Sequence, residues 1–156
     1  LGDALAIALL DRRGFTAEDF QVLHPGGQLG QNLLRVGDLM HDTADLPLVD
    51  AGASVGDAIL VMTNKGFGCA GVVDSGGQLT GIITDGDLRR HMSDTLLQLT
   101  CADIMTPDPK TIRAQALASE ALGLMNASKI TSLFVAEDRT PTGILHIHDC
   151  LRAGIA

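Results

Sequence analysis

The chain has 156 residues, of which 46% are hydrophobic and 19% charged, so it holds enough apolar side chains to bury a core and is not a disordered segment. Nineteen acidic residues against eleven Lys and Arg give a net charge of −8, which repels phosphate backbones and anionic lipids and argues against binding to nucleic acid or membranes. Aromatic residues make up 3% with no Trp or Tyr, so platforms for stacking bases are scarce. No run approaches the ~20 apolar residues of a membrane span.

The three cysteines, Cys69, Cys101 and Cys150, are widely spaced and include no CxxC pair. An odd number in this pattern predicts buried or free thiols in a reducing compartment, not a disulfide framework, and we therefore expect a cytoplasmic protein. The chain begins with Leu1 inside a stretch that favours a helix, so we also expect it to be a piece of a longer protein.

The N-terminal segment differs in pattern from the rest of the chain. Residues 1–13 are strong helix formers, and Gly14 follows where a glycine commonly ends a helix. Thr16 and Asp19 have the spacing of a capping box, which predicts the start of a second helix. Residues 24–30 then predict a loop, since they contain three glycines and a proline.

From about Val36 the sequence repeats itself. Three segments recur 65, 63 and 62 positions later, namely Val36–Met40 as Cys101–Met105, Asp57–Met62 as Glu120–Met125, and Gly81–Ile83 as Gly143–Leu145. A unit of about sixty residues buries too little surface to be comfortably stable alone, so we expect the two copies to pack as a pair. The predicted division is an N-terminal part over 1–32, a first copy over 33–97 and a second copy over 98–156.

Each copy contains helix and strand patterns in the same order. In the first, Ser54 has the position of an N-cap, and apolar residues follow at helical spacing, namely Val55, Ala58, Ile59 and Met62. Further patterns predict strands over 70–74 and 78–84, a turn at 75–77 and a helix over 85–92. The second copy predicts a helix over 116–127, strands over 132–136 and 142–146, and a helix from His148. Each copy is thus a β-α-β-β-α unit, which predicts an α/β (α+β) fold with small sheets between helices.

Two motifs mark the copies, [VI]-x-D-[IL]-M at the opening and G-h-h-[ST]-x-x-D-h near the end, where h is hydrophobic. The first copy matches both in full and the second copy in part. The segments MTPDPKTI at Met105–Ile112 and GIITDGDLRR at Gly81–Arg90 add to this pattern. Together they make the chain from about Leu33 onwards resemble a tandem pair of CBS domains, named after cystathionine β-synthase. The resemblance implies a pseudo-symmetric pair that forms dimers and whose clefts bind adenosyl or other nucleotide ligands.

The end of the predicted strand over 78–84 is the first candidate site. Asp87 follows Thr84 in the first turn of the next helix, where unpaired N–H groups favour phosphate beside the threonine hydroxyl. The Asp87 carboxylate is able to accept two hydrogen bonds from vicinal ribose hydroxyls. The alternative is that Thr84 and Asp87 only cap the helix, a role for which Asp85 also competes. Arg89 and Arg90 either add positive charge to this site or lie on the helix surface.

The second copy departs from this pattern, because His146 stands where the first copy has Thr84, while Asp149 is retained. A ribose contact at Asp149 is still expected, and His146 or His148 would donate to an anion, most strongly when charged. The alternative is a metal site, since side chains two apart on a strand share a face. No third converging ligand is visible in the sequence, so no metal is predicted.

Residues in the helix-to-strand turns complete the candidate ligand-binding set. Lys65 and Lys129 lie in corresponding turns, and Thr131 and Ser132 follow the second lysine. The CBS resemblance implies that these turns line the clefts, where the lysines would offset the charge of −8 near a phosphorylated ligand, and it adds Met105 to the set. The alternative is that both lysines are solvated turn residues.

Residues 1–30, taken with the CBS pair and the ending GILHIHDCLRAGI, resemble D-arabinose-5-phosphate isomerases. In that family a sugar isomerase (SIS) domain precedes two CBS domains and interconverts D-ribulose 5-phosphate and D-arabinose 5-phosphate, the first step towards the lipopolysaccharide sugar Kdo. The resemblance makes His24 of the HPGG segment a candidate base that shuttles a proton through an enediol; the alternative is a turn histidine. Because most of an SIS domain is absent, the chain alone is predicted to be inactive.

Two functions of different kinds remain as hypotheses. In the first, the clefts sense a nucleotide or nucleotide-sugar such as CMP-Kdo, or an adenine nucleotide such as AMP or ATP, and regulate the chain's own SIS domain with no cofactor required. In the second, the pair is a scaffold with vestigial clefts that forms a homodimer, and a tetramer in the parent enzyme. Retention of Thr84, Asp87 and Asp149 favours sensing, whereas His146 keeps the scaffold hypothesis open.

Overall fold

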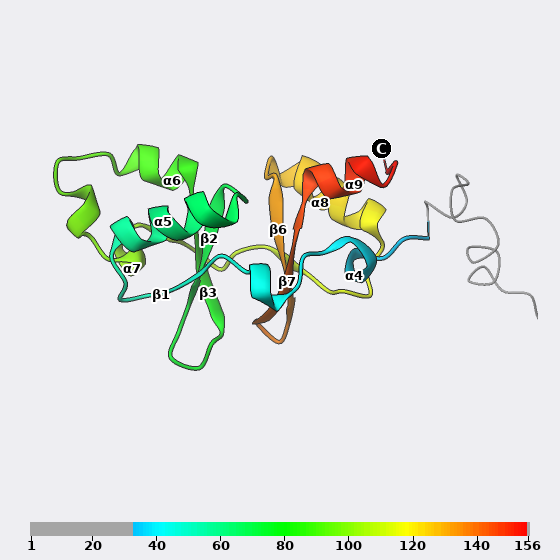
Figure 1. Cartoon of the computed structure of the whole chain (residues 1–156), viewed down its shortest axis with the longest axis horizontal. Helices are drawn as coiled ribbons and strands as arrows, with labels where there is room; N and C mark the ends of the chain where they lie inside the picture. The colour runs from blue at the N-terminus through cyan, green and yellow to red at the C-terminus, as the bar shows by residue number, and fades with distance from the viewer. Residues whose placement is uncertain (1–32, 156) are drawn as a thin grey trace, which may run out of the picture.

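The computed structural model describes residues 33–155. The helices and the loop predicted over residues 1–30, and His24 with them, lie outside the described residues. Figure 1 shows two similar halves whose strands meet at the centre, with the main helices on the outer sides. Within residues 33–155, no helix is long and apolar enough to cross a membrane.

Both halves have the predicted β-α-β-β-α order. The elements of the first half are β1 (Leu48–Asp50), α5 (Val55–Lys65), β2 (Cys69–Val73), β3 (Leu79–Thr84) and α6 (Asp85–Arg90). Those of the second half are β5 (Thr111–Ile112), α8 (Ala118–Ser128), β6 (Ser132–Glu137), β7 (Thr140–His146) and α9 (Ile147–Arg152). The remaining elements are α4 (Val36–Leu39), α7 (Cys101–Ile104), β4 (Thr106–Pro107) and two short 3-10 turns, η1 (Thr43–Asp45) and η2 (Leu96–Gln98). The mixed α/β fold is therefore confirmed.

Each half is built on its own small sheet. The strand order is β1-β2-β3-β4 in the first half and β5-β6-β7 in the second. In both, the first strand pairs parallel to the second, because the intervening helix carries the chain back, and the second pairs antiparallel with the third through a hairpin. The hairpins end where α6 and α9 begin, so the ends of β3 and β7 occupy equivalent places.

The two long helices begin and end differently. Helix α5 starts at the predicted N-cap, where the Ser54 side chain accepts a hydrogen bond from the Asp57 N–H at 3.1 Å, and Gly66 in the left-handed conformation ends it. Helix α8 has Leu117 as its N-cap with no side-chain hydrogen bond, and it starts two residues later than predicted. Its left-handed C-cap is Lys129, with φ of 55°.

The opening motifs of the repeat each pack against the opposite half. Helix α4 precedes the first half but docks on the second, where the Val36 N–H donates to the Ala116 carbonyl at 2.9 Å. Helix α7 docks on the first half, where the Cys101 N–H donates to the Ala53 carbonyl at 2.8 Å. The chain thus crosses between the halves at both motifs.

Glycines in β3 and β7 allow the methionines of these motifs to approach the strands. A Cβ at Gly143 would lie 2.7 Å from Met40 Sδ, closer than real Cβ atoms come. Gly81 and Met105 make the corresponding contact in the first half. The recurring methionine and glycine of the two motifs are therefore packing partners, which the sequence alone did not reveal.

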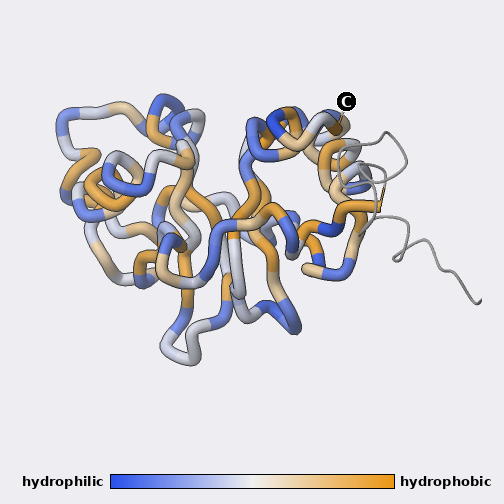
Figure 2. The backbone as a smooth tube through the Cα atoms, turned by 45° about the vertical axis from the view of Figure 1, so that its right-hand side comes forward, coloured by the Kyte–Doolittle hydropathy of each residue, from blue (hydrophilic) through white to orange (hydrophobic). Residues whose placement is uncertain are grey.

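One cluster of buried side chains joins the two halves. Its buried members come from both halves, namely Leu46, Phe67, Cys69, Leu79, Phe134 and Ile144. A Cβ at Gly71 of β2 would lie 2.7 Å from the Phe134 ring, so the two sheets are in close contact there. Figure 2 shows the hydrophobic stretches gathered along the central strands, whereas the hairpin tips are polar. The halves therefore pack as a pair, as their small size predicted.

Candidate ligand-binding cleft

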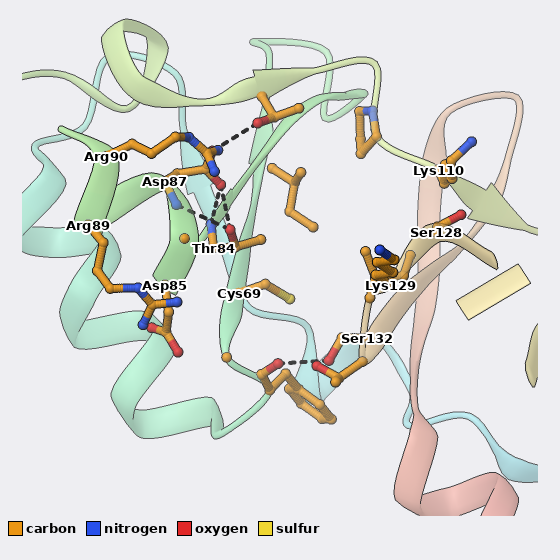
Figure 3. Close-up of a pocket in the computed structure, with 18 of the residues that line it drawn as sticks. Cys69, Thr84, Asp85, Asp87, Arg89, Arg90, Lys110, Ser128, Lys129 and Ser132 are labelled. Carbon is orange, nitrogen blue, oxygen red and sulfur yellow. Dashed lines mark hydrogen bonds and ion pairs between the residues drawn. The ribbon is translucent and has the colours of Figure 1, made fainter. Parts of the chain in front are cut away.

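A pocket of about 580 Å³ lies between the two halves. One wall is the end of β3 with α6, the opposite wall is the turn over 128–132, and the segment over 106–110 connects them (Figure 3). Of the predicted ligand-binding residues, this pocket brings together Thr84, Asp87, Lys129, Thr131 and Ser132.

Asp87 is the residue around which the polar side chains of the first-half wall are hydrogen-bonded. Its side chain is only 2% exposed. Oδ2 accepts from the Thr84 N–H at 2.8 Å and the Thr84 hydroxyl at 2.6 Å. Oδ1 accepts from the Thr106 hydroxyl at 2.9 Å and from the Arg90 guanidinium (Figure 3). Burial raises the pKa of Asp87, but the hydrogen bonds from Thr84 and Thr106 and the charge of Arg90 outweigh it, so the pKa lies below its ordinary value.

The helix-capping alternative describes the same pair of residues. Thr84 is the N-cap of α6 and accepts from the Asp87 N–H at 3.4 Å, and the two side chains form a capping box. Asp85 does not take the cap position. Capping and ligand binding use the same atoms at this site, so a ligand contact at Thr84 and Asp87 stays a prediction.

Positive charge is concentrated on both walls of the pocket. Its lining includes four cationic side chains, from Arg89 and Arg90 on α6 and from Lys110 and Lys129 on the opposite side, against three aspartates. All four cationic residues are exposed. In a chain with a net charge of −8, this excess favours an anionic ligand that reaches both walls.

The two predicted turn lysines have different positions. Lys65 is the last residue of α5; its Nζ donates to the Ala44 carbonyl at 2.6 Å, and it does not line this pocket. The counterpart of Lys129 is Gly66, because both are the left-handed C-caps of equivalent helices. Lys65 and Lys129 thus lie at the ends of equivalent helices, but Lys65 is one position earlier than the residue that matches Lys129. A lysine pays a conformational penalty in this backbone region, whereas glycine does not.

The other residues near the pocket have mainly packing roles in this state. The buried Ser132 hydroxyl donates to the Phe67 carbonyl at 2.7 Å and so links the two halves. Met105 packs against Gly81 and the first-half core and does not line the pocket. Burial raises the pKa of the Cys69 thiol to about 12, so this pocket residue is not a nucleophile at neutral pH.

The equivalent position of the second half holds a histidine-rich cluster. Asp149 Oδ2 accepts from the His146 N–H at 3.0 Å and from His41 Nε2 at 3.2 Å, and Oδ1 accepts from Arg152 at 2.8 Å. His146 Nδ1 accepts from the His148 N–H at 3.2 Å. Burial and the neighbouring His148 lower the pKa of His146, which favours the neutral ring.

The two clusters correspond residue by residue but differ in chemistry. His146 and His41 replace Thr84 and Thr106, while the aspartate and the arginine three positions later are retained. Among residues 33–155, no group of three or more His, Cys, Asp or Glu side chains is arranged to hold a metal ion.

Sequence reasoning missed several residues at the two clusters, namely His41, Thr106, Lys110 and Arg152. One signal was available. The residue after the recurring methionine is His41 in one copy and Thr106 in the other, and both reach the aspartate of the half on which the motif docks.

Comparison with known proteins agrees with this architecture. The CBS domain family matches residues 36–94 and 101–156, and the chain belongs to this family as a tandem pair of CBS domains. Among solved structures, CBSX2 from Arabidopsis thaliana in complex with AMP is similar with a TM-score of 0.69 and 29% sequence identity, over 78% of this chain and 96% of that one.

The curated relatives point to one group of enzymes within this family. The chain is 52% identical to the arabinose 5-phosphate isomerase KdsD of Pseudomonas aeruginosa over 99% of its own length and 49% of that protein. It is 50% identical to the enzyme of the same name from Escherichia coli, over 99% of its own length and 48% of that protein. The chain thus spans about half the length of these relatives, and the resemblance to the isomerases is confirmed.

Proposed function

We propose that this CBS pair is a sensing module that binds a nucleotide or nucleotide-sugar in the cleft between its halves. The observation that carries the proposal is the pairing of a ribose-type acceptor, Asp87, with cationic side chains on both walls of a pocket of about 580 Å³. Such a pocket has the size of a small-molecule site. The AMP complex of the similar CBSX2 protein supports a nucleotide as the ligand class.

We further propose that the module regulates an arabinose 5-phosphate isomerase. The chain is 52% and 50% identical in sequence to two curated isomerases, and this similarity supports the assignment. The whole enzyme would interconvert D-ribulose 5-phosphate and D-arabinose 5-phosphate on the path to Kdo and lipopolysaccharide. In that enzyme His24 is the proposed proton-shuttling base, and the 156-residue chain alone would not isomerise either sugar phosphate.

Among candidate ligands, CMP-Kdo fits the charge of the pocket best. It carries a phosphodiester and a carboxylate at separate positions, and the pocket has cations on two opposite walls. AMP places its charge at one end only. CMP-Kdo would also be a late product of the route to lipopolysaccharide on which the isomerase acts, so its binding would allow feedback regulation. An adenine-nucleotide sensor is the second candidate, supported by the AMP bound to CBSX2.

Calorimetric titration of the chain with CMP-Kdo, CMP, AMP and ATP tests the proposal. We expect CMP-Kdo to bind most tightly and Asp87→Asn to weaken binding at least ~10-fold, since a charged hydrogen bond contributes about 1.5–3 kcal/mol. Asp94→Asn, an exposed acid outside the pocket, is the control. If none of the four ligands binds at millimolar concentration, the sensing proposal fails. A preference for AMP or ATP over CMP-Kdo would select the adenine-nucleotide alternative.

The scaffold hypothesis makes a different prediction. A pure scaffold would form a homodimer and bind no nucleotide, whereas a sensor binds nucleotide whether or not it dimerises. Light scattering during size exclusion, with and without CMP-Kdo, measures the dimer, which we propose forms through the CBS pairs. A dimer with no ligand binding would favour the scaffold.

A further inference from the structure

We infer that Arg90 is a displaceable cover of Asp87, which competes with the ligand and must leave the carboxylate before a ribose binds there. The inference rests on the proposed nucleotide-binding function. In this inference Arg90 does more than add positive charge to the pocket, because it also blocks the carboxylate that the ligand would use.

The hydrogen bonds of Asp87 leave no position free for a ligand. A carboxylate offers about four acceptor positions, and here four donors occupy them: the Thr84 N–H, the Thr84 hydroxyl, the Thr106 hydroxyl and the Arg90 guanidinium. The Asp87 side chain is only 2% exposed. A vicinal diol therefore cannot reach the carboxylate until at least one donor leaves.

Arg90 is the donor that leaves most readily. The Thr84 N–H is fixed in the backbone at the start of α6, and both hydroxyls sit on short side chains attached to β3 and β4. The Arg90 side chain is long and 64% exposed, so water solvates its guanidinium equally well once it swings out. Only the Asp87 side of this ion pair is buried; the arginine side faces solvent, where water replaces the lost partner.

The same cover is present in the second half. Arg152 lies three residues after Asp149, donates to its carboxylate at 2.8 Å and is 75% exposed, while Asp149 is 11% exposed. The neighbouring hydroxyls have become histidines in this half, yet the arginine remains at the same spacing. The two clusters differ in their other residues, but in each of them an exposed arginine covers the aspartate carboxylate.

Displacement has a consequence for selectivity. Once released, Arg90 stays at the pocket and is able to pair with a phosphate, which compensates for the contact it loses to Asp87. A nucleoside has ribose hydroxyls but no phosphate and gains no such compensation. Arg90 therefore opposes binding of nucleosides more than binding of nucleotides.

Nuclear magnetic resonance titrations of wild-type, Arg90→Gln and Arg89→Gln chains with cytidine, adenosine, CMP and AMP test the inference. We expect Arg90→Gln to bind the nucleosides at least threefold more tightly than wild type and to lose part of the preference for nucleotides. Arg89→Gln removes the same charge from the same pocket without touching Asp87, so it measures the effect of pocket charge alone, and its gain in nucleoside affinity should be smaller than that of Arg90→Gln. Thermal melting of each variant checks that it is folded.

The outcomes separate this inference from the proposed function. If wild type binds nucleotides but Arg90→Gln binds nucleosides no more tightly than Arg89→Gln does, the cover is wrong and the sensing function stands. If none of these four ligands binds to any of the three chains, the inference fails, and the calorimetric titration with CMP-Kdo and ATP decides whether the proposed function fails as well.

Discussion

At the scale of single residues, the state of Asp87 decides what the cleft is able to do. Four donors hold a buried carboxylate in its charged form. Its pKa is below the ordinary value of 3.8. The stabilisation it provides is therefore complete above that value and is lost as the pH falls through the lower pKa of the folded state.

Replacing Thr106 by Val tests this charge stabilisation. The change removes the 2.9 Å donor to Asp87, so we expect a loss of about 1 kcal/mol in the free energy of unfolding at pH 7. The difference from wild type should shrink as the pH falls below 3.8 and passes through the lowered pKa of Asp87. Urea unfolding at a series of pH values measures both effects. A difference that grows as the pH falls below 3.8 would contradict this role of the Asp87 charge.

Cys69 allows a second test at this scale. Its thiol is buried and has its pKa raised to about 12, and Cys101 and Cys150 are buried as well. Because the thiolate is the reactive form, we expect maleimide to label none of the three at pH 7 within minutes in the native chain and all three in urea. Mass spectrometry counts the labels. Rapid native labelling of Cys69 would show that the pocket is more open than described.

At the scale of elements, the two halves use different residues at equivalent positions, as the ends of the two long helices show. Helix α5 ends on Gly66, whereas α8 ends on Lys129 with φ of 55°. Glycine is the less strained choice in this conformation. The lysine is tolerated at a position that lines the cleft, where its charge serves the proposed ligand.

Exchanging Lys129 for Gly should therefore stabilise the chain and weaken its binding. We expect a gain of up to about 1 kcal/mol in the free energy of unfolding and a severalfold loss of CMP-Kdo affinity. The reverse exchange, Gly66→Lys, is the matched control and should destabilise by a similar amount. Chemical unfolding and calorimetry measure the two quantities. If Lys129→Gly destabilises the chain, the left-handed cap is not strained.

The start of α9 depends on a neutral histidine. Burial and the neighbouring His148 lower the pKa of His146, although Asp149 opposes the shift and Arg152 and His41 add to it. The unfolded chain then binds the proton more readily, so stability is full above pH 6.5 and falls as the pH drops from there to the lower folded-state pKa.

His146→Thr, which copies the first half, tests this dependence. We expect the variant to lose less stability than wild type between pH 7 and pH 5, because threonine does not titrate. Thermal melting over this range gives the comparison. An unchanged pH dependence would contradict this role of His146.

At the scale of the whole molecule, the contact between the sheets makes the two halves one unit. Gly71 of β2 lies against Phe134 of β6, and the Ser132 hydroxyl joins the Phe67 carbonyl across the same boundary. The pocket lies beside this contact, so its shape depends on how the halves pack.

Gly71→Ala should disturb that packing. The new methyl group would meet Phe134 at 2.7 Å and Leu79 at 2.8 Å, and we expect a loss of about 1–3 kcal/mol. Gly52→Ala, which adds a methyl group with nothing within 4 Å, is the control. Calorimetry should show a single unfolding transition for wild type. A wild type that melts in two separate transitions would contradict the idea of one unit.

Much of this architecture was predictable because it depends on short-range sequence. The Ser54 cap and the pairing of Thr84 with Asp87 involve residues within one turn of each other. The β-α-β-β-α order follows from patterns inside each element, and the repeat follows from comparing those patterns along the chain. Element ends were less accurate: the helix predicted over 85–92 ends at Arg90. The strand over 142–146 begins earlier, at Thr140.

The sequence by itself determined that two similar units exist and which aspartate each carries. Only the tertiary structure decided what surrounds those aspartates, because each opening motif docks on the opposite half and brings Thr106 to Asp87 and His41 to Asp149. These pairs are 19 and 108 residues apart in sequence, and no local pattern specifies their contact. The contact is specified instead by the packing of Met105 against Gly81 and of Met40 against Gly143, which only the assembled halves reveal.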